Sequence, residues 1–318
     1  MSASIRNSVL LYRIAVSIWT ARKLDKSESA KVNETAGAVT GAANVHKQLL
    51  PDCPELEAIR KWGTSFRTFV YLTTAPWDDN GWRAGNAANH MDFMMAVGDK
   101  IAEGEALVEQ FIAVYERAIA EAQFRLANLF DARDYDTVEA VRRKFRFAVE
   151  VMPLPAVDDF RIVEGLTQDE ADRLVNAAQT AADERIAGAM EDAYERLYEV
   201  VAKMAGTLGA FGAGEIKKFN DTLVSNIADL LEVMPALNLT NDPKLAALAA
   251  KAKELALYSA VDLRKDPAVR EAAITEAQAL AELMKPTTIP AMSHEQQAGR
   301  ANRPAAKAEL FADMLAGE

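Results

Sequence analysis

The 318-residue chain contains a single cysteine, Cys53, and only three histidines, His46, His90 and His294. One cysteine excludes an intramolecular disulfide and is compatible with a reducing compartment. None of the histidines has a glutamate three residues earlier or a second histidine four residues away, so the spacings that place metal ligands on one helix face are missing. We therefore predict no metal centre and no cofactor, and we expect His90 to form a local hydrogen-bonded pair with Asp92.

Long apolar runs are also missing. No stretch reaches about 18 uninterrupted apolar residues, so we expect no membrane-spanning helix. The stretch from Val9 to Trp19 is interrupted by Arg13 and alternates with a period of two, which favours a strand over a signal peptide. The net charge of −11 and the pI near 5.0 argue against binding of nucleic acid or anionic membranes by bulk charge. A cytoplasmic location is the expectation.

Catalytic patterns are equally scarce. The glycine-rich run at 205–215 follows a helical pattern and lacks the Lys-Ser/Thr ending of a phosphate loop, so it predicts a helix-to-helix hinge. Neither Cys53 nor any serine has a local pattern that supplies a base and an orienting partner. The pairs Asp78–Asp79 and Asp158–Asp159 are typical of turns, where aspartate forms Asx turns and caps. We assign no catalytic residue and expect a protein that is not an enzyme.

The patterns that are present predict a mainly α-helical α+β fold, with a small β-sheet in the N-terminal half and a long-helix bundle in the C-terminal half. Strand character marks Leu10–Thr20, Phe66–Thr74 and Lys144–Met152. Apolar residues recur at helical spacing over Met91–Phe130. The division expected from composition is an α+β domain over 1–160, a helical bundle over 161–285 and a flexible tail over 286–318.

Start and stop signals divide the C-terminal half into helices. Thr167 and Glu170 fit a capping box, which begins a predicted helix of about 40 residues. Four glycines between 206 and 214 interrupt the pattern before a second helix over 215–234. Asp-Pro steps at 242–243 and 266–267 place a capping carboxylate before a proline at the first helical position, and so predict two further helix starts.

The tail carries one further apolar pattern. Its last residues form a predicted short helix with an apolar face made of Leu310, Phe311, Met314 and Leu315. A short amphipathic helix on a tether is typical of a docking peptide.

The stretch 73–93 is the least helical in composition, with two of the four tryptophans, a proline and two glycines. Its Asn80–Gly81 step is a strong turn signal. We predict a rigid corner in which Trp77 is buried against the sheet and Arg83 is held by Asp78, Asp79 or the Asp158–Asp159 pair. The candidate structural or partner-binding residues are Trp77, Trp82, Arg83, Asp159, Phe160 and Arg161.

A basic cluster lies at the third predicted strand, where Phe145 and Phe147 alternate with cationic residues. The cations are Arg142, Arg143, Lys144 and Arg146, and further cations flank the first strand. A basic aromatic sheet face could follow single-stranded nucleic acid. The other interpretation is that these cations pair with surface carboxylates.

Five stretches carry a family resemblance: AVSIWTARKLDK at 15–26, LTTAPWDDNGWR at 72–83, FIAVYERAIAEAQFRLANLF at 111–130, FRFAVEVMPLPAVDDFRI at 145–162 and LLEVMPALNLTNDPKL at 230–245. Their most specific motifs are Thr-x-Pro-Trp, Met-Pro-x-Pro followed by Asp-Phe-Arg, and Leu-Asn-Leu-Thr-x-Asp-Pro. Together they resemble a family of domain-of-unknown-function proteins carried by bacteriophages and bacteria. The resemblance covers about residues 10–285.

The resemblance implies a context rather than an activity. Such proteins look like companions of MoxR-type AAA+ ATPases and of von Willebrand factor A domain proteins related to cobaltochelatase subunits. The leading expectation is therefore a phage-encoded adaptor or assembly protein of such a system, in the host cell cytoplasm. The alternatives are a single-stranded nucleic-acid-binding protein and a self-assembling phage structural protein, which would form homo-oligomers.

Overall fold

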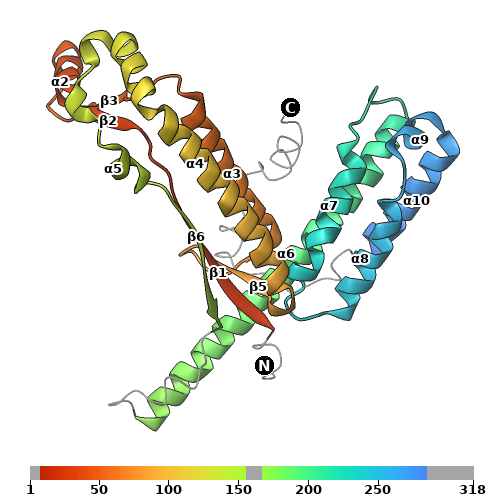
Figure 1. Ribbon diagram of the computed structural model, residues 1–318. Coiled ribbons are helices and arrows are strands. Elements are labelled where there is room, and N and C mark those ends of the chain that lie inside the picture. The colour runs from red at the N-terminus through yellow and green to blue at the C-terminus, as the bar shows by residue number, and fades with distance from the viewer. Residues whose placement is uncertain (1–7, 155–166, 285–318) are drawn as a thin grey trace. The chain divides into compact units, whose positions relative to one another are not determined.

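The computed structural model describes residues 8–154 and 167–284. These residues divide into two compact units (Figure 1). Unit 1 takes its described residues from 8–12, 71–91, 151–154 and 167–284, whereas unit 2 consists of 13–70 and 92–150. The chain therefore passes from one unit to the other several times. This division differs from the one expected from composition, because residues 71–91 pack with the C-terminal helices.

The strands form two sheets. Their bounds are β1 Val9–Ser17, β2 Arg22–Asp25, β3 Val45–Gln48, β4 Ala75–Pro76, β5 Trp82–Asn86 and β6 Arg146–Pro153. The larger sheet has the order β4-β5-β1-β6, and the smaller one pairs β2 with β3 in antiparallel fashion. The first and third predicted strands are thus confirmed as β1 and β6, while β2 and β3 have no counterpart in the prediction.

Helices make up most of the described chain. Their bounds are α2 Lys26–Thr35, α3 Pro54–Thr73, α4 His90–Leu126, α5 Val138–Arg142, α6 Gln168–Gly212, α7 Thr222–Leu237, α8 Pro243–Leu255, α9 Ala260–Lys265 and α10 Pro267–Met284. Short 3-10 turns add η1 Ala87–Asn89, η2 Ala127–Leu129 and η3 Ala132–Asp134. Among these described helices, none combines the length and apolar character that crossing a membrane requires.

The second predicted strand, Phe66–Thr74, is wrong. Its residues form the last turns of α3 and the step into β4. The aromatic and β-branched side chains belong to a helical stripe in which Ile59, Trp62, Phe66 and Val70 are all buried, at spacings of three and four. The helical period, which begins before the window that looked like a strand, overrides the local β propensity.

Unit 2 has a core in which α3 and α4 approach closely. Gly104 of α4 lies against the ring of Trp62, and a Cβ atom built on it would come within 2.4 Å of that ring. The Trp62 indole is fixed because its Nε1 donates to the Lys100 carbonyl at 3.0 Å. The ring also stacks on Phe66, with centroids 5.3 Å apart, and contacts Phe147 at 4.3 Å.

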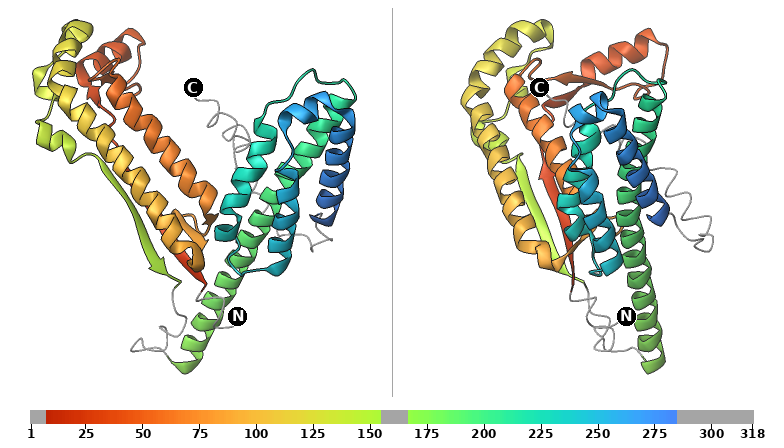
Figure 2. Two further views of the ribbon diagram at one scale, coloured as in Figure 1. Left: turned by 45° about the vertical axis from the view of Figure 1, so that its right-hand side comes forward. Right: turned by 90° about the vertical axis from the view of Figure 1, so that its right-hand side faces the viewer.

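Unit 1 consists mainly of the bundle of α6, α7, α8 and α10 (Figure 2). The capping box predicted at Thr167 and Glu170 is present, and α6 runs for 45 residues. The predicted glycine hinge is wrong in its position, because α6 continues through Gly206 and Gly209 and ends at Gly212. Gly214 follows with φ of +77°, a conformation that glycine adopts without strain.

Two predicted helix starts in the bundle are confirmed. The Asp242 carboxylate accepts from the Lys244 amide at 2.8 Å, and Asp266 accepts from the Ala268 amide at 2.8 Å. The helix predicted over 215–234 begins later, at Thr222 of α7, and a short α9 separates α8 from α10. The tail beyond Met284 lies outside the described residues.

Candidate functional site

The most site-like feature of unit 1 is a groove of about 430 Å³ between α7 and α8. Its floor is apolar, lined by Leu231, Met234, Pro235, Ala246, Ala249 and Ala250. Polar side chains line the rest, namely Asn89, Asn238, Asn241 and Lys253. We call this feature the α7–α8 groove. An apolar floor with a few polar groups, within the usual 300–1,000 Å³ range, is typical of ligand and peptide sites.

The sequence explains the groove locally. Small alanines at positions 246, 249 and 250 face α7, so α8 leaves space that longer side chains would fill. On the other side, Pro235 lies inside α7 and has no amide hydrogen for the carbonyl of Leu231, four residues earlier. Leu231 also lines the groove, so one groove residue lacks the usual helical donor for its carbonyl.

A buried polar network fixes the end of the groove. Asn86, which is 3% exposed, donates from Nδ2 to the Asn238 carbonyl at 2.7 Å and to Asn241 Oδ1 at 2.8 Å. The Asn238 side chain closes the loop by donating to the Asp242 carbonyl at 3.0 Å and accepting from the Asp242 amide at 2.7 Å. Asn241 takes a positive φ of 52°, which asparagine tolerates better than most residues.

Two further side chains bind the loop of residues 238–242, which connects α7 to α8. Ser8 donates to the Leu239 carbonyl at 2.9 Å, and the Tyr194 hydroxyl on α6 donates to Asp242 Oδ2 at 2.7 Å. Burial and the neighbouring Asp242 carboxylate raise the pKa of Tyr194 above its ordinary value, so it remains a donor at neutral pH. The loop is therefore rigid before any ligand arrives, which lowers the entropic cost of binding.

Several polar groups at the groove are not used within the described part of the chain. The Asn89 side chain and Asn241 Nδ2 make no hydrogen bond there, and Lys253, which is exposed, makes no ion pair there. They offer amide and cationic contacts around an apolar floor. The arrangement suits an amphipathic segment that carries both apolar side chains and a carboxylate.

The tryptophan-rich corner is a buried structural element. Trp77 is 8% exposed, so its predicted burial is confirmed, and its core includes strand residues such as Val9 and Ala84 as well as residues of α6, α7, α8 and α10, which the prediction did not include. Trp82 packs partly buried against the same core. Asp78 Oδ1 accepts from the amides of Asn80 and Trp82 at 3.0 Å each, which is the predicted Asx turn. Gly81 completes the turn with φ of +85°.

Arg83 has partners at the end of α3 that the prediction did not include. Its Nε donates to Thr74 Oγ1 at 2.7 Å, and its Nη2 donates to the carbonyls of Thr74 and Tyr71 at 2.6 and 3.0 Å. Its guanidinium also lies 4.6 Å from the centre of the Tyr71 ring. Within the described residues neither Asp78 nor Asp79 holds it, because Asp78 serves the turn. The guanidinium thus ties the corner to the end of α3.

Some predicted residues cannot be placed. Asp159, Phe160 and Arg161, and with them the Asp158–Asp159 alternative for Arg83, lie outside the described residues. The same holds for the predicted docking face of Leu310, Phe311, Met314 and Leu315.

His90 has a different partner from the one predicted. Its Nδ1 lies 3.1 Å from the Tyr12 hydroxyl, and the two rings stack with centroids 6.0 Å apart. Burial raises the pKa of Tyr12 to about 12, so the hydroxyl keeps its proton at neutral pH. The contact joins β1 to the start of α4. Tyr12 and His90 are 78 residues apart in the sequence, so no local pattern could predict their pairing.

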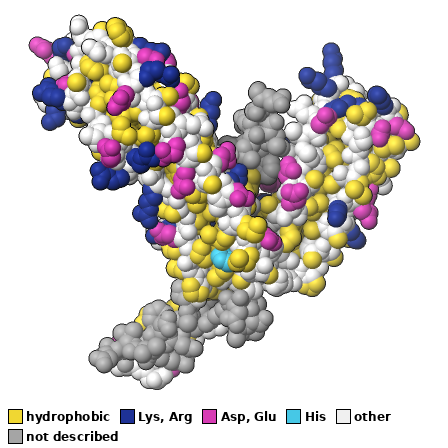
Figure 3. Space-filling view, in the orientation of Figure 1, with side chains coloured by type: hydrophobic (Ala, Val, Ile, Leu, Met, Phe, Trp, Pro, Cys, Tyr) yellow, Lys and Arg dark blue, Asp and Glu magenta, His cyan; other side chains and the backbone are white. Residues whose placement is uncertain are grey.

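The basic strand residues lie in a mixed-charge setting. Arg142 pairs with Glu109, and Lys144 pairs with Asp136 at 2.5 Å. Phe145 and Phe147 pack inward on Phe111 and Trp62, whereas Arg143 and Arg146 are exposed. Strand alternation thus separates the rings from the Arg146 side chain. Figure 3 shows acidic and basic side chains interspersed on the visible face of unit 2.

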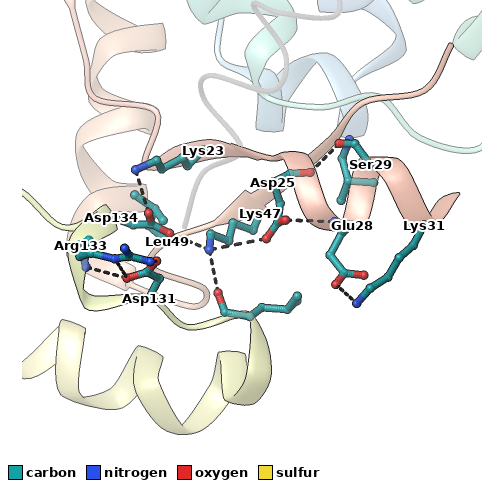
Figure 4. Close-up of polar contacts among 12 residues, drawn as sticks. Lys23, Asp25, Glu28, Ser29, Lys31, Lys47, Leu49, Asp131, Arg133 and Asp134 are labelled. Carbon is teal, nitrogen blue, oxygen red and sulfur yellow. Dashed lines mark hydrogen bonds and ion pairs between the residues drawn. The ribbon is translucent and has the colours of Figure 1, made fainter. Parts of the chain in front are cut away.

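A compact ionic cluster joins β2 and β3 to the segment after α4 (Figure 4). Lys47 Nζ lies 2.6 Å from Asp134 and 3.6 Å from Asp25, and donates to the Leu129 carbonyl at 2.8 Å. Lys23 binds Asp134 from the other side at 2.7 Å. Burial raises the pKa of Asp134, but the hydrogen bonds and charges of Lys23 and Lys47 outweigh it and leave the pKa below its ordinary value. These ion pairs stabilise the packing of β2 and β3 against the segment after α4.

Unit 2 also contains a smaller hollow of about 290 Å³ around Cys53. The thiol lies 3.7 Å from Glu55 Oε2, and burial raises its pKa, which makes it less reactive than a free cysteine. Across 8–154 and 167–284, no group of three His, Cys, Asp or Glu side chains is arranged to hold a metal ion.

Sequence reasoning missed the groove residues Asn86, Asn89, Asn238, Asn241 and Lys253. A usable signal existed in the motif Leu-Asn-Leu-Thr-Asn-Asp-Pro at 237–243, where two asparagines separate the end of one helix from a capping Asp-Pro. The contribution of Asn86 and Asn89 depends on tertiary packing and has no local signal.

Comparison of the chain with protein-family models, with curated proteins and with solved structures finds no match.

Proposed function

We propose that the protein is a non-enzymatic adaptor or assembly protein whose α7–α8 groove receives a segment of a partner protein. The observation that carries this proposal is the combination of an apolar floor with unused polar groups at Asn89, Asn241 and Lys253. The rigid Asn86–Asn238 network supports it, since a preformed site binds at lower entropic cost.

The sequence resemblance suggests which partners to test. A MoxR-type AAA+ ATPase and a von Willebrand factor A protein are the proposed partners, in the cytoplasm of a phage-infected host. Rings of AAA+ ATPases act through adaptors, and a groove that takes an amphipathic acidic segment is a means of attachment.

The test is co-expression with such an ATPase, followed by pull-down and a binding titration with the full-length protein. Ala250→Glu places a charge on the groove floor and should weaken binding at least about tenfold, which corresponds to about 1.4 kcal/mol. Ala247→Glu is the matched control, because Ala247 is exposed on the same helix and does not line the groove. Failure of the unmodified protein to bind, or equal loss in both variants, would refute the proposal.

The single-stranded nucleic-acid alternative predicts a separate outcome. Anisotropy of a labelled oligonucleotide should then show binding at low salt that weakens steeply as salt rises, and Arg143→Ala and Arg146→Ala should weaken it further. Absence of binding at low salt dismisses this alternative. Self-assembly predicts large oligomers by light scattering, and a monomer at high concentration dismisses it.

A further inference from the structure

The apolar floor of the α7–α8 groove needs an occupant when no partner is bound. Its apolar floor includes Ala246 and Ala250, which are exposed in the described chain. Lys253 stands at its rim without an ion pair among the described residues. The occupant should therefore carry several apolar side chains on one face and negative charge nearby.

We propose that the chain's own C-terminal segment, residues 305–315, binds in the α7–α8 groove and competes there with the partner; this inference rests on the groove being a binding site. The sequence places Leu310, Phe311, Met314 and Leu315 on one face of the segment if it is helical. The same stretch carries Glu309 and Asp313.

Charge favours this occupant. The last fourteen residues, AAKAELFADMLAGE, contain three acidic side chains and one lysine. The groove's own charged side chain is Lys253, so an acidic apolar segment is attracted and a basic one is disfavoured. An apolar face on such a segment can lie on Met234 and Ala250, as amphipathic helices do in the grooves that receive them.

The chain between Met284 and residue 305 is also long enough for the C-terminal segment to reach the groove. The chain leaves the bundle at Met284, the end of α10, and α10 packs against α8. The stretch from 285 to 304 spans up to about 65 Å when extended, at ~3.3 Å per residue. Helix α8 has 13 residues and is about 20 Å long. The segment can therefore reach every part of the groove from its own chain.

The first experiment is cysteine cross-linking in the full-length chain, with Cys53→Ser to remove the native thiol. Ala250→Cys is combined with Met314→Cys under mild oxidation at low protein concentration, and Ala247→Cys replaces Ala250→Cys in the matched control. A disulfide needs Cα atoms about 4.4–6.8 Å apart, so a bond forms only if the segment lies at the groove. We expect an intramolecular bond with position 250 and little with position 247.

Three results would overturn the proposal: no bond at position 250, equal bonding at 247 and 250, or bonded dimers, which would mean that the segment comes from a second copy. This readout needs no partner, so it succeeds or fails independently of the adaptor function.

The second experiment measures competition. In the full-length protein, Phe311→Glu should release the segment and raise partner affinity about tenfold if the tethered segment acts at millimolar effective concentration. A labelled peptide of residues 303–318 should likewise bind this variant more tightly than the unmodified chain. If the segment is instead a docking peptide for the partner, Phe311→Glu lowers partner affinity. That loss, or tighter peptide binding by the unmodified chain, would refute competition.

Discussion

The contact between Gly104 and Trp62 permits a sharp test of packing in unit 2. Glycine in a helix interior normally costs about 0.5–1 kcal/mol relative to alanine, so Gly→Ala substitutions in helices tend to stabilise. At position 104 the new Cβ would lie 2.4 Å from the Trp62 ring. The ring cannot move away easily, because its Nε1 is bound to the Lys100 carbonyl and both Phe66 and Phe147 contact it.

Overpacking of a well-packed core costs about 1–3 kcal/mol. After the gain in helix propensity is subtracted, Gly104→Ala should lower the free energy of unfolding by roughly 0.5–2 kcal/mol. Gly98→Ala is the control, since Gly98 lies on the same helix and a Cβ there meets nothing within 4 Å. It should raise the free energy of unfolding by about 0.5–1 kcal/mol.

The assay is urea unfolding followed by circular dichroism and tryptophan fluorescence. Trp62→Leu provides the second arm of a double-mutant cycle, because removal of the ring should turn Gly104→Ala from destabilising to stabilising. If Gly104→Ala stabilises the unmodified protein as much as Gly98→Ala does, the close packing of α3 and α4 described here is refuted.

Four further outcomes are expected. Trp77→Ala should lower the free energy of unfolding by about 3–5 kcal/mol, because the ring is buried, and an unchanged melting temperature would mean that it is not. Asn86→Ala should cost about 1–2 kcal/mol by removing the two hydrogen bonds that its Nδ2 donates to the Asn238 carbonyl and to Asn241 Oδ1, and it should also weaken partner binding at the groove. Lys47→Met should cost about 3 kcal/mol in thermal or urea unfolding, whereas Lys31→Met, at an exposed pair, should change little. The pKa of Asp134 lies below its ordinary value in the folded protein, so the ionised carboxylate contributes its full stabilisation above pH ~4. That contribution is lost as the pH falls through the lowered pKa. Asp134→Asn should therefore reduce the decrease in the free energy of unfolding over this acidic range, measured by urea unfolding at a series of pH values.

Much of the fold follows from local signals. The capping box at Thr167 and Glu170 and the two Asp-Pro steps define helix starts through atoms within a few residues of one another, and all three are confirmed. The strand predicted over Phe66–Thr74 is wrong, because the aromatic and β-branched residues there belong to a longer helical stripe that begins before Phe66.

The candidate site could not be predicted in the same way. The groove depends on Asn86 meeting Asn238, 152 residues later, and on alanines of α8 facing Pro235. Neither pairing has a local pattern. The buried state of Trp77 was predictable. The contacts of Arg83 with Tyr71 and Thr74 and that of His90 with Tyr12 were not, since tertiary packing determines them.

The division of the chain between the two units also determines when each can form during synthesis. Unit 2 has all its residues once position 150 has been translated. The core of unit 1 includes Val9, Trp77 and helices as late as α10, so it is incomplete until about residue 284 has been translated. At ~5–20 residues per second, synthesis from residue 151 to residue 284 takes roughly 7–27 s. Unit 2 can therefore fold before unit 1 is complete, and apolar residues of unit 1 are open to chaperones during the interval.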